Sequence, residues 1–269
     1  MSHDVGPQVI PDGGSALSPA GDHGDHVHEP GHGHHRHGHD HQRPPSTRTL
    51  RLEAALLAKN DRIAAANRTW LSHRGIVALN LIGAPGAGKT SLLEATARKL
   101  AGSTPLFVIE GDQATTRDAD RIRDAGAVAE QIITGTGCHL DAVMVRTAAM
   151  RMGFPRGALV FVENVGNLVC PALFDLGERA KVVVTSVTEG EDKPEKYPHV
   201  FRAATVAVLT KTDLIPHVAF DRAEFLASVR RVSPRLPVIE TTTAAASGLR
   251  PWLTWLATER LTKAYRHAR

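Results

Sequence analysis

Cysteine is scarce in this chain of 269 residues, which contains only Cys138 and Cys170. Two cysteines cannot form the disulfide framework of a small secreted domain, so we expect both thiols to be reduced and free to bind metal. Long apolar runs are absent too: no stretch approaches the ~18 residues of a bilayer-spanning helix, and no charged-then-apolar leader is present. We therefore expect a cytoplasmic protein that is neither exported nor inserted into a membrane.

Aromatic residues make up only 4% of the sequence, although the formal net charge is +4. Proteins that bind single-stranded nucleic acid interleave basic and aromatic side chains, and that pattern does not occur here. Ligands that carry phosphate explain the basic charge adequately. We expect no nucleic-acid partner.

Apolar periodicity is missing from residues 1–45, which contain ten of the fifteen histidines, separated by glycine and acidic residues. Such a segment cannot bury enough surface to offset the entropy of ordering it. A flexible chain with many imidazoles can wrap around nickel, zinc or copper without a preformed site. An expression tag is the alternative, but the histidine spacing is irregular and the run begins near residue 23. We predict a disordered, metal-binding tail over residues 1–45, with nickel bound by His23, His26, His28, His32, His34, His35, His37, His39 and His41.

A phosphate-binding loop follows the apolar run at residues 76–82. Residues 83–90 read Gly-Ala-Pro-Gly-Ala-Gly-Lys-Thr, a complete G-x-x-x-x-G-K-[ST] motif, and a helical pattern follows at residues 91–100. In this context backbone N–H groups and a helix N-terminus surround phosphate oxygens. We expect Lys89 to reach the β- and γ-phosphates as a catalytic residue and Thr90 to bind Mg²⁺. The predicted nucleotide contacts here are Gly83, Ala84, Pro85, Gly86, Ala87, Gly88, Lys89, Thr90 and Ser91.

Strand and helix patterns alternate along the rest of the chain. Apolar runs occur at residues 106–109, 128–133, 158–162, 181–187, 206–209 and 237–239, and helical patterns at residues 49–73, 116–125, 140–152, 221–232 and 249–265. Several of the strands are apolar throughout, which is typical of a parallel sheet covered on both faces. We predict one α/β phosphate-loop NTPase domain over residues 46–269, with a mainly parallel sheet and helices on both faces.

A guanine site is predicted where Lys211 and Asp213 follow the strand at 206–209. A carboxylate there accepts both edge donors of guanine, which adenine lacks, while the lysine stem lies along the purine. Such paired hydrogen bonds reject the wrong base by a factor of ~10⁴. Thr210 stands where other GTPases have Asn, and we expect it to weaken the link between base site and phosphate loop. A surface Lys/Asp pair is the alternative, but the phosphate loop upstream favours GTP.

Two carboxylates at predicted strand ends are candidates for the magnesium side of the site. Residues 163–166 read Glu-Asn-Val-Gly, the layout of the D-x-x-G element, in which Gly166 N–H contacts the γ-phosphate and Glu163 holds Mg²⁺ or its water. Asp112 ends an earlier strand and is the second candidate. Each carboxylate alone is explained equally well as a helix cap. Asn167 stands where fast GTPases carry a water-orienting Gln, so we predict slow hydrolysis.

A thiol and an imidazole adjoin at Cys138 and His139, at the start of the helix predicted from residue 140. A helix end lowers the pKa of a thiol and so favours the thiolate. Adjacent residues on a helix diverge by about 100°, so we expect the pair to chelate poorly without ligands from elsewhere. Cys170 lies four residues beyond Gly166, next to the nucleotide sensor. Buried structural cysteines are one alternative to a metal site, and a catalytic Cys–His pair is another.

Together these segments resemble the HypB family of hydrogenase nickel-incorporation GTPases. The resemblance runs over residues 50–269 and is carried by residues 83–90, 110–113, 137–141, 163–171 and 211–213. The related urease accessory GTPase carries Cys-Pro-His, whereas no proline separates Cys138 from His139. The resemblance implies a dimerising GTPase that works with a maturation partner protein and delivers nickel to the large subunit of [NiFe]-hydrogenase. It also implies an interface site for nickel or zinc at Cys138, His139 and Cys170.

We therefore predict a GTP-hydrolysing nickel metallochaperone that uses GTP, Mg²⁺ and Ni²⁺, with Zn²⁺ as a further candidate ion. GTP is expected to favour a homodimer through the segments around Asp112 and residues 163–170. Some relatives carry an N-terminal cysteine-rich nickel motif, which this chain replaces with its His-rich tail. Three other functions stay open: a urease-type nickel accessory GTPase, a non-enzymatic metal store with a vestigial loop, and a small-molecule kinase that uses ATP.

Overall fold

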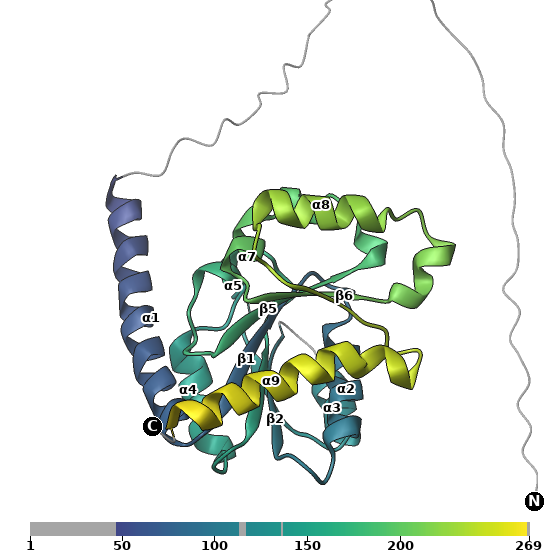
Figure 1. Ribbon diagram of the computed structural model, residues 1–269. Coiled ribbons are helices and arrows are strands. Elements are labelled where there is room, and N and C mark those ends of the chain that lie inside the picture. Colours follow the sequence, from purple (N-terminus) through teal and green to yellow (C-terminus); the bar gives the residue numbers. More distant parts are fainter. Residues whose placement is uncertain (1–46, 113–116, 136, 268–269) are drawn as a thin grey trace, which may run out of the picture. The chain divides into compact units, whose positions relative to one another are not determined.

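The computed structural model describes residues 47–112, 117–135 and 137–267 (Figure 1). The nine tail histidines predicted to bind nickel lie outside the described residues, so the disordered metal-binding tail stays a prediction. Residues 113–116, which follow Asp112, also lie outside.

Seven strands of the described chain form one sheet, in the order β3-β2-β4-β1-β5-β6-β7. The strands are β1 (Val77–Ile82), β2 (Leu106–Asp112), β3 (Val128–Ile133), β4 (Leu159–Glu163), β5 (Ala180–Ser186), β6 (Val206–Thr210) and β7 (Val238–Glu240). Every neighbouring pair is parallel. This confirms the predicted parallel α/β sheet, with each strand close to its expected position.

Helices cover both faces of the sheet (Figure 1). They are α1 (Thr47–His73), α2 (Lys89–Leu100), α3 (Arg117–Asp124), α4 (Ala142–Met152), α5 (Cys170–Leu173), α6 (Lys193–Lys196), α7 (Pro198–Ala203), α8 (Arg222–Val232) and α9 (Arg250–His267), with 3-10 turns η1 (Val187–Glu189), η2 (Thr212–His217) and η3 (Ala246–Leu249). Among the described residues, none of these helices combines the length and apolar composition required to cross a bilayer.

The side chains of each strand alternate between two apolar layers. In β1, Leu79 and Leu81 pack with residues of α2, α3 and α9, whereas Ala78 packs with α1 and α4 on the other face. A third cluster, formed with α7 and α8, covers that second face beside β5 and β6. Because both faces are buried, the strands are apolar almost throughout, which explains why apolar runs located them in the sequence.

β1 lies between β4 and β5. The chain adds β2, β3 and β4 on one side of β1 and β5, β6 and β7 on the other, so the topology switches at β1. In open parallel sheets, ligands bind outside the carboxyl ends of the strands at such a switch point. The loops after β1, β2, β4 and β6 all emerge at this edge. The sequence motifs for phosphate, magnesium and base therefore meet at one end of the molecule.

Candidate nucleotide pocket and metal cluster

The phosphate-binding loop has a backbone that only glycine permits at several positions. Gly86 and Gly88 have φ angles of 78° and 91°, in the region that side-chain-bearing residues rarely adopt. A Cβ on Gly83 would lie 2.5 Å from the Val184 carbonyl oxygen, because the loop passes directly over β5. Helix α2 begins immediately after Gly88. The loop thus has the tight turn and helix N-terminus that phosphate binding requires.

Lys89 is buried and lies across the loop. Its ammonium donates to the carbonyl oxygens of Gly83, at 3.1 Å, and Ala84, at 3.3 Å. An ammonium has three donors, so one stays available for a further acceptor such as a phosphate oxygen.

Glu110 and Glu163 form a buried carboxyl pair at the ends of β2 and β4. They are register partners in the sheet and are 3% and 5% exposed. Thr90 Oγ1 donates to Glu163 Oε1 at 2.9 Å, while the second oxygen of each carboxyl has no hydrogen-bond partner among the described residues.

Burial determines the protonation of this carboxyl pair. It raises the pKa of Glu163 to about 7, against the opposing influence of Lys89. Burial, together with the neighbouring Glu163 charge, raises the pKa of Glu110 to about 8. Hydroxyl and carboxyl oxygens are the ligands that Mg²⁺ prefers, and a divalent cation compensates two buried carboxylates with unpartnered oxygens. The donor set at Thr90, Glu110 and Glu163 therefore fits Mg²⁺.

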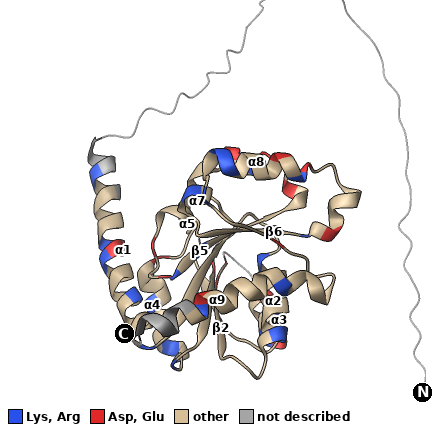
Figure 2. Cartoon of the chain, in the orientation of Figure 1, with Lys and Arg blue, Asp and Glu red and all other residues tan. Residues whose placement is uncertain are grey.

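A cavity of about 430 Å³ opens beside these groups. Its lining includes the predicted residues Pro85, Gly86, Gly88, Lys89, Thr90, Ser91, Asp112, Glu163, Gly166 and Lys211. Gly83 and Ala87 are buried within the loop, and Ala84 faces a second cavity. Helix α3, on which Figure 2 shows both acidic and basic residues, adds Asp118 and Arg121 to the lining.

Gly166 packs directly against the phosphate-binding loop. A Cβ at this position would lie 2.8 Å from Pro85 Cγ. The predicted γ-phosphate sensor thus lies directly beside the loop, with no room for a side chain between them.

The predicted base site follows β6. Lys211 Nζ donates to the Gly86 carbonyl oxygen at 2.8 Å, and Asp213 is exposed and accepts a hydrogen bond from the Thr242 hydroxyl. Thr210, which we expected to weaken the link to the phosphate loop, still bonds it: Thr210 Oγ1 donates to the Ala87 carbonyl oxygen at 2.6 Å. A hydroxyl thus makes a contact with the loop at the position where other GTPases have Asn.

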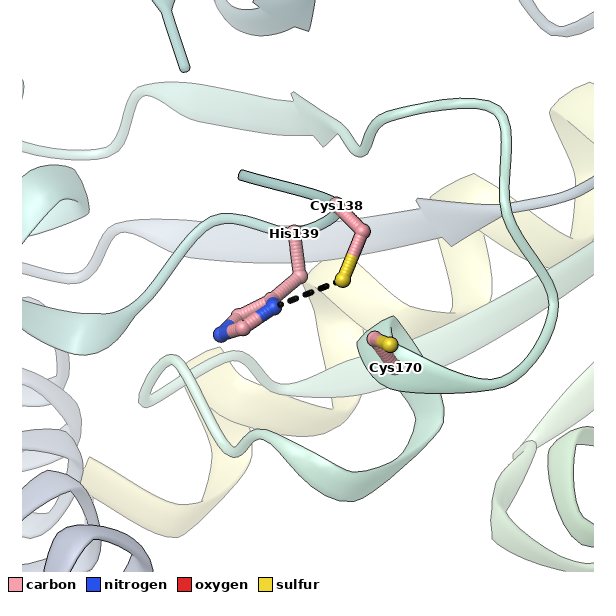
Figure 3. A group of neighbouring side chains, drawn as sticks. All are labelled: Cys138, His139 and Cys170. Carbon is pink, nitrogen blue, oxygen red and sulfur yellow. Dashed lines mark hydrogen bonds between the residues drawn. The ribbon is translucent and has the colours of Figure 1, made fainter. Parts of the chain in front are cut away.

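Cys138, His139 and Cys170 converge on one point (Figure 3). One ligand atom from each lies within 4.8 Å of the others, and Cys138 Sγ lies 3.5 Å from His139 Nδ1. Hydrogen bonding to Cys138 is the main cause, and burial the second, of a raised pKa of the Cys170 thiol. Two thiols and an imidazole are soft and borderline ligands that suit nickel and zinc.

The position of Cys138 and His139 corrects two expectations. Helix α4 begins at Ala142, where the Asp141 side chain caps it by accepting from Met144 N–H at 2.7 Å. Cys138 and His139 therefore precede the helix, and the argument that a helix end acts on the thiol does not apply. The expected divergence of the two side chains was also wrong, because the chain bends at Cys138 and His139 and their ligand atoms lie close together.

Phe174, at the end of α5, stacks on the His139 ring. The centroids are 3.8 Å apart and the planes differ by 26°. Burial lowers the pKa of His139, which favours the neutral imidazole that binds metals. The sequence analysis missed Phe174, since only tertiary structure brings it to the histidine.

The metal cluster and the nucleotide pocket share a wall. A second cavity, of about 400 Å³, is lined by Cys138 and also by Pro85, Asp112 and Gly166, which line the first cavity as well. Asp112 and Gly166 thus line both the cavity beside the phosphate loop and the cavity beside a thiol of the cluster.

Comparison with known proteins decides the family. Residues 77–240 match the CobW/HypB/UreG nucleotide-binding domain. The chain is 52% identical over 217 residues to hydrogenase maturation factor HypB of Azotobacter vinelandii, covering 81% of this chain and 72% of the relative. It is 50% identical over 213 residues to HypB of Escherichia coli K12, covering 79% and 73%. The chain belongs to the HypB family.

Solved structures of HypB proteins have the same fold. HypB from Archaeoglobus fulgidus superimposes with a TM-score of 0.70 at 38% identity, covering 76% of this chain and all of that one. HypB from Helicobacter pylori, solved in complex with nickel, gives 0.71 at 33% identity, covering 76% and 96%. Family membership confirms the resemblance noted in the sequence and the predicted phosphate-loop fold.

Two further polar residues of the HypB-family site escaped the sequence analysis as site residues. Glu110 carried a signal, because a carboxyl group directly follows the apolar residues of β2. Thr242 carried none, since its contact with Asp213 joins residues 29 positions apart.

Proposed function

We propose that this HypB-family protein is a GTP-hydrolysing nickel metallochaperone that assists nickel insertion into [NiFe]-hydrogenase. One observation carries the proposal: residues 163–170 begin at the carboxyl group bonded to Thr90 of the phosphate loop and end at Cys170 of the metal cluster. A movement of Glu163 on binding or loss of the γ-phosphate can therefore reach Cys170 through a segment of eight residues.

Each residue of the nucleotide pocket has a proposed role. Lys89 stabilises the charge of the γ-phosphate, Gly166 N–H contacts that phosphate, and Lys211 with Asp213 holds guanine. Mg²⁺, when bound, neutralises phosphate charge, and Thr90 and Glu163 are proposed to hold it, with Asp112 beside them.

Slow hydrolysis is part of the proposal. The Asn167 side chain is bonded within its own turn, because its Oδ1 accepts from Val169 N–H at 2.8 Å. An amide held in this way does not orient an attacking water, and the residue is shorter than the Gln of fast GTPases.

Nickel is the proposed cargo of Cys138, His139 and Cys170, and zinc is a second candidate. Three ligands leave a position for water or for a residue of a partner chain, which suits a transfer site. Val169 and Leu173, which flank Cys170, are 51% and 58% exposed. These apolar side chains support the proposed GTP-favoured homodimer at this surface. A maturation partner and the hydrogenase large subunit are the proposed recipients of nickel.

Storage of nickel by the His-rich segment, and a cytoplasmic location, stay predictions. A urease-type function is the alternative within this family. The urease accessory GTPase carries Cys-Pro-His. In this chain no proline separates Cys138 from His139, which speaks against the urease-type function.

The proposal is tested by measuring GTPase rate and thiolate-bound nickel on one purified sample of the full chain. Because residues 1–45 contain no cysteine, thiolate-to-nickel charge-transfer absorption reports the cluster alone. Turnover with GTP but not ATP, together with an absorption band that Cys138→Ser removes, is the expected result. Preference for ATP would favour a kinase, and a band without any turnover would favour a metal store.

A further inference from the structure

Two separate segments of the chain supply the metal cluster, and helix α1 contacts both. Cys138 and His139 lie just before α4, whereas Cys170 lies on α5 (Figure 3). Two asparagines of α1, Asn60 and Asn67, are only 6% and 2% exposed. They are seven residues apart, so they lie on the same face of the helix.

Each asparagine connects the two ligand-bearing segments with its single side chain. Asn60 Oδ1 accepts from Ala142 N–H at 2.9 Å, and Asn60 Nδ2 donates to the Asp175 carbonyl oxygen at 2.8 Å. Asn67 Nδ2 donates to the carbonyl oxygens of Ala142, at 2.8 Å, and Leu176, at 3.1 Å. Four hydrogen bonds from one helix face thus join the start of α4 to the turn after α5.

The turn after α5 is shaped to let α1 approach. Gly177 has a φ of 89°, and a Cβ there would lie 2.6 Å from both the Ala64 carbonyl oxygen and Asn67 Cβ. Any larger residue would push the helix away. Arg68 also pairs with the Asp175 carboxylate at 2.6 Å, but this contact is exposed and involves only one of the two segments.

The bonded atoms lie close in sequence to the ligands. Ala142 is three residues beyond His139, and Asp175 directly follows Phe174, whose ring stacks on His139. Moving the two segments apart would separate Cys170 from the other two ligands. The asparagine bridges therefore act on the spacing that a metal ion requires.

Packing alone does not account for buried amides at these positions. An apolar side chain of similar size would bury α1 equally well, whereas a buried amide is costly unless it is hydrogen-bonded. Asn60 uses both its donor and its acceptor across the two segments. Amides at these positions give directional bonds, which fix spacing in a way that apolar contacts do not.

We propose that Asn60 and Asn67 are positioning residues of the metal cluster. They hold the Cys138–His139 segment and the Cys170 segment at the separation of a preformed site, so that metal binding pays little to order its ligands. This inference rests on the proposed metal-binding function. It adds α1, remote from the ligands in sequence, to the machinery that sets metal affinity.

The test uses the full chain and titrates Ni²⁺ while following thiolate charge-transfer absorption. Asn60→Leu keeps the side-chain size and removes both bonds. Asn60→Asp keeps the acceptor for Ala142 N–H but cannot donate to Asp175. Arg68→Gln is the matched control, since it removes a contact of α1 with one segment only.

The expected result is a loss of nickel affinity of about tenfold or more for Asn60→Leu, with a changed absorption spectrum, as for outer-shell partners of metal ligands. Asn60→Asp is expected to lose less. Binding of GDP by both variants, measured without nickel, is expected to stay within about twofold of the wild type, because Asn60 does not line the nucleotide pocket. Binding of nickel by Arg68→Gln is expected to stay within the same range. GDP binding also shows that each variant is folded, and Asn60→Asp carries the test if Asn60→Leu does not fold.

Two results overturn the inference alone: an unchanged nickel affinity and spectrum in both folded Asn60 variants, or an equal loss in Arg68→Gln. A parallel loss of nickel and GDP affinity would show a merely structural role and would overturn it too. A wild-type chain without a thiolate band contradicts the proposed function, and this inference with it.

Discussion

Thr90 donates a hydrogen bond of 2.9 Å to Glu163, and this bond joins the phosphate-binding loop to the carboxyl end of β4. Residue 163 begins the segment that passes Gly166, in contact with Pro85, and ends at Cys170. Any ligand that draws Thr90 or Glu163 toward itself acts on this segment. The nucleotide pocket and the metal cluster are therefore two ends of one short stretch of chain.

Lys89→Ala is expected to lower GTP hydrolysis by about a hundredfold or more, because it removes the buried ammonium of the phosphate loop. Lys99→Ala, an exposed lysine on the same helix, is the control and is expected to leave turnover unchanged. Phosphate release under saturating GTP is the measurement. Normal turnover in a folded Lys89→Ala chain would contradict the enzymatic assignment.

Asp213→Asn is expected to weaken GTP binding about tenfold to a hundredfold, since an amide cannot accept two hydrogen bonds from guanine with the strength of a carboxylate. Affinity for xanthosine triphosphate is expected to rise, because xanthine presents an acceptor where guanine has a donor. Direct titration with both nucleotides measures the effect, and Asp124→Asn on α3 is the control. An unchanged GTP affinity would place the base site elsewhere.

Stability of the nucleotide-free and metal-free chain is expected to fall as pH rises from about 5 to about 8 through the Glu110–Glu163 pair. The pKa values of these groups are raised in the folded state, to about 8 and about 7, so the folded chain binds more protons than the unfolded chain over this range. Glu110→Gln is expected to flatten the dependence. Thermal midpoints at about pH 6 and about pH 8 test this, and equal pH dependence in wild type and variant would argue against a buried, protonated Glu110.

Deletion of residues 1–45 is expected to remove most bound nickel equivalents and to leave the GTPase rate close to that of the full chain. The predicted nickel-binding tail holds ten histidines, whereas the nucleotide pocket is built wholly from later residues. Equilibrium dialysis gives the stoichiometry. A deletion variant that binds as much nickel as the full chain would refute storage by the tail.

Local rules were sufficient to predict the phosphate loop and the strands. The backbone conformation of residues 83–90 explains the glycines of the motif. Gly86 and Gly88 have positive φ, and Gly83 approaches β5 closely, so few other residues fit these positions. Strands buried on both faces are continuous apolar runs, so the sequence located them without an alignment.

Contacts between distant residues were beyond those rules. The Asn60 and Asn67 bridges join residues 75 to 115 positions apart, and no local pattern distinguishes such asparagines from surface ones. The Glu110–Glu163 pair depends on β2 lying beside β4, which sequence order alone does not give. The Cys138–His139 error was local: the Asp141 cap sets the start of α4 two residues later than apolar periodicity suggested.

The most direct test of the account is a nickel titration of the full chain in its GDP-bound and GTP-analogue-bound forms, followed by thiolate charge-transfer absorption. We predict nickel dissociation constants that differ by about fivefold or more between the two forms, and a nucleotide affinity that nickel shifts by the same factor, as reciprocal linkage requires. Cys170→Ser is expected to abolish the difference. Identical dissociation constants in the two forms would contradict coupling between the nucleotide pocket and the metal cluster.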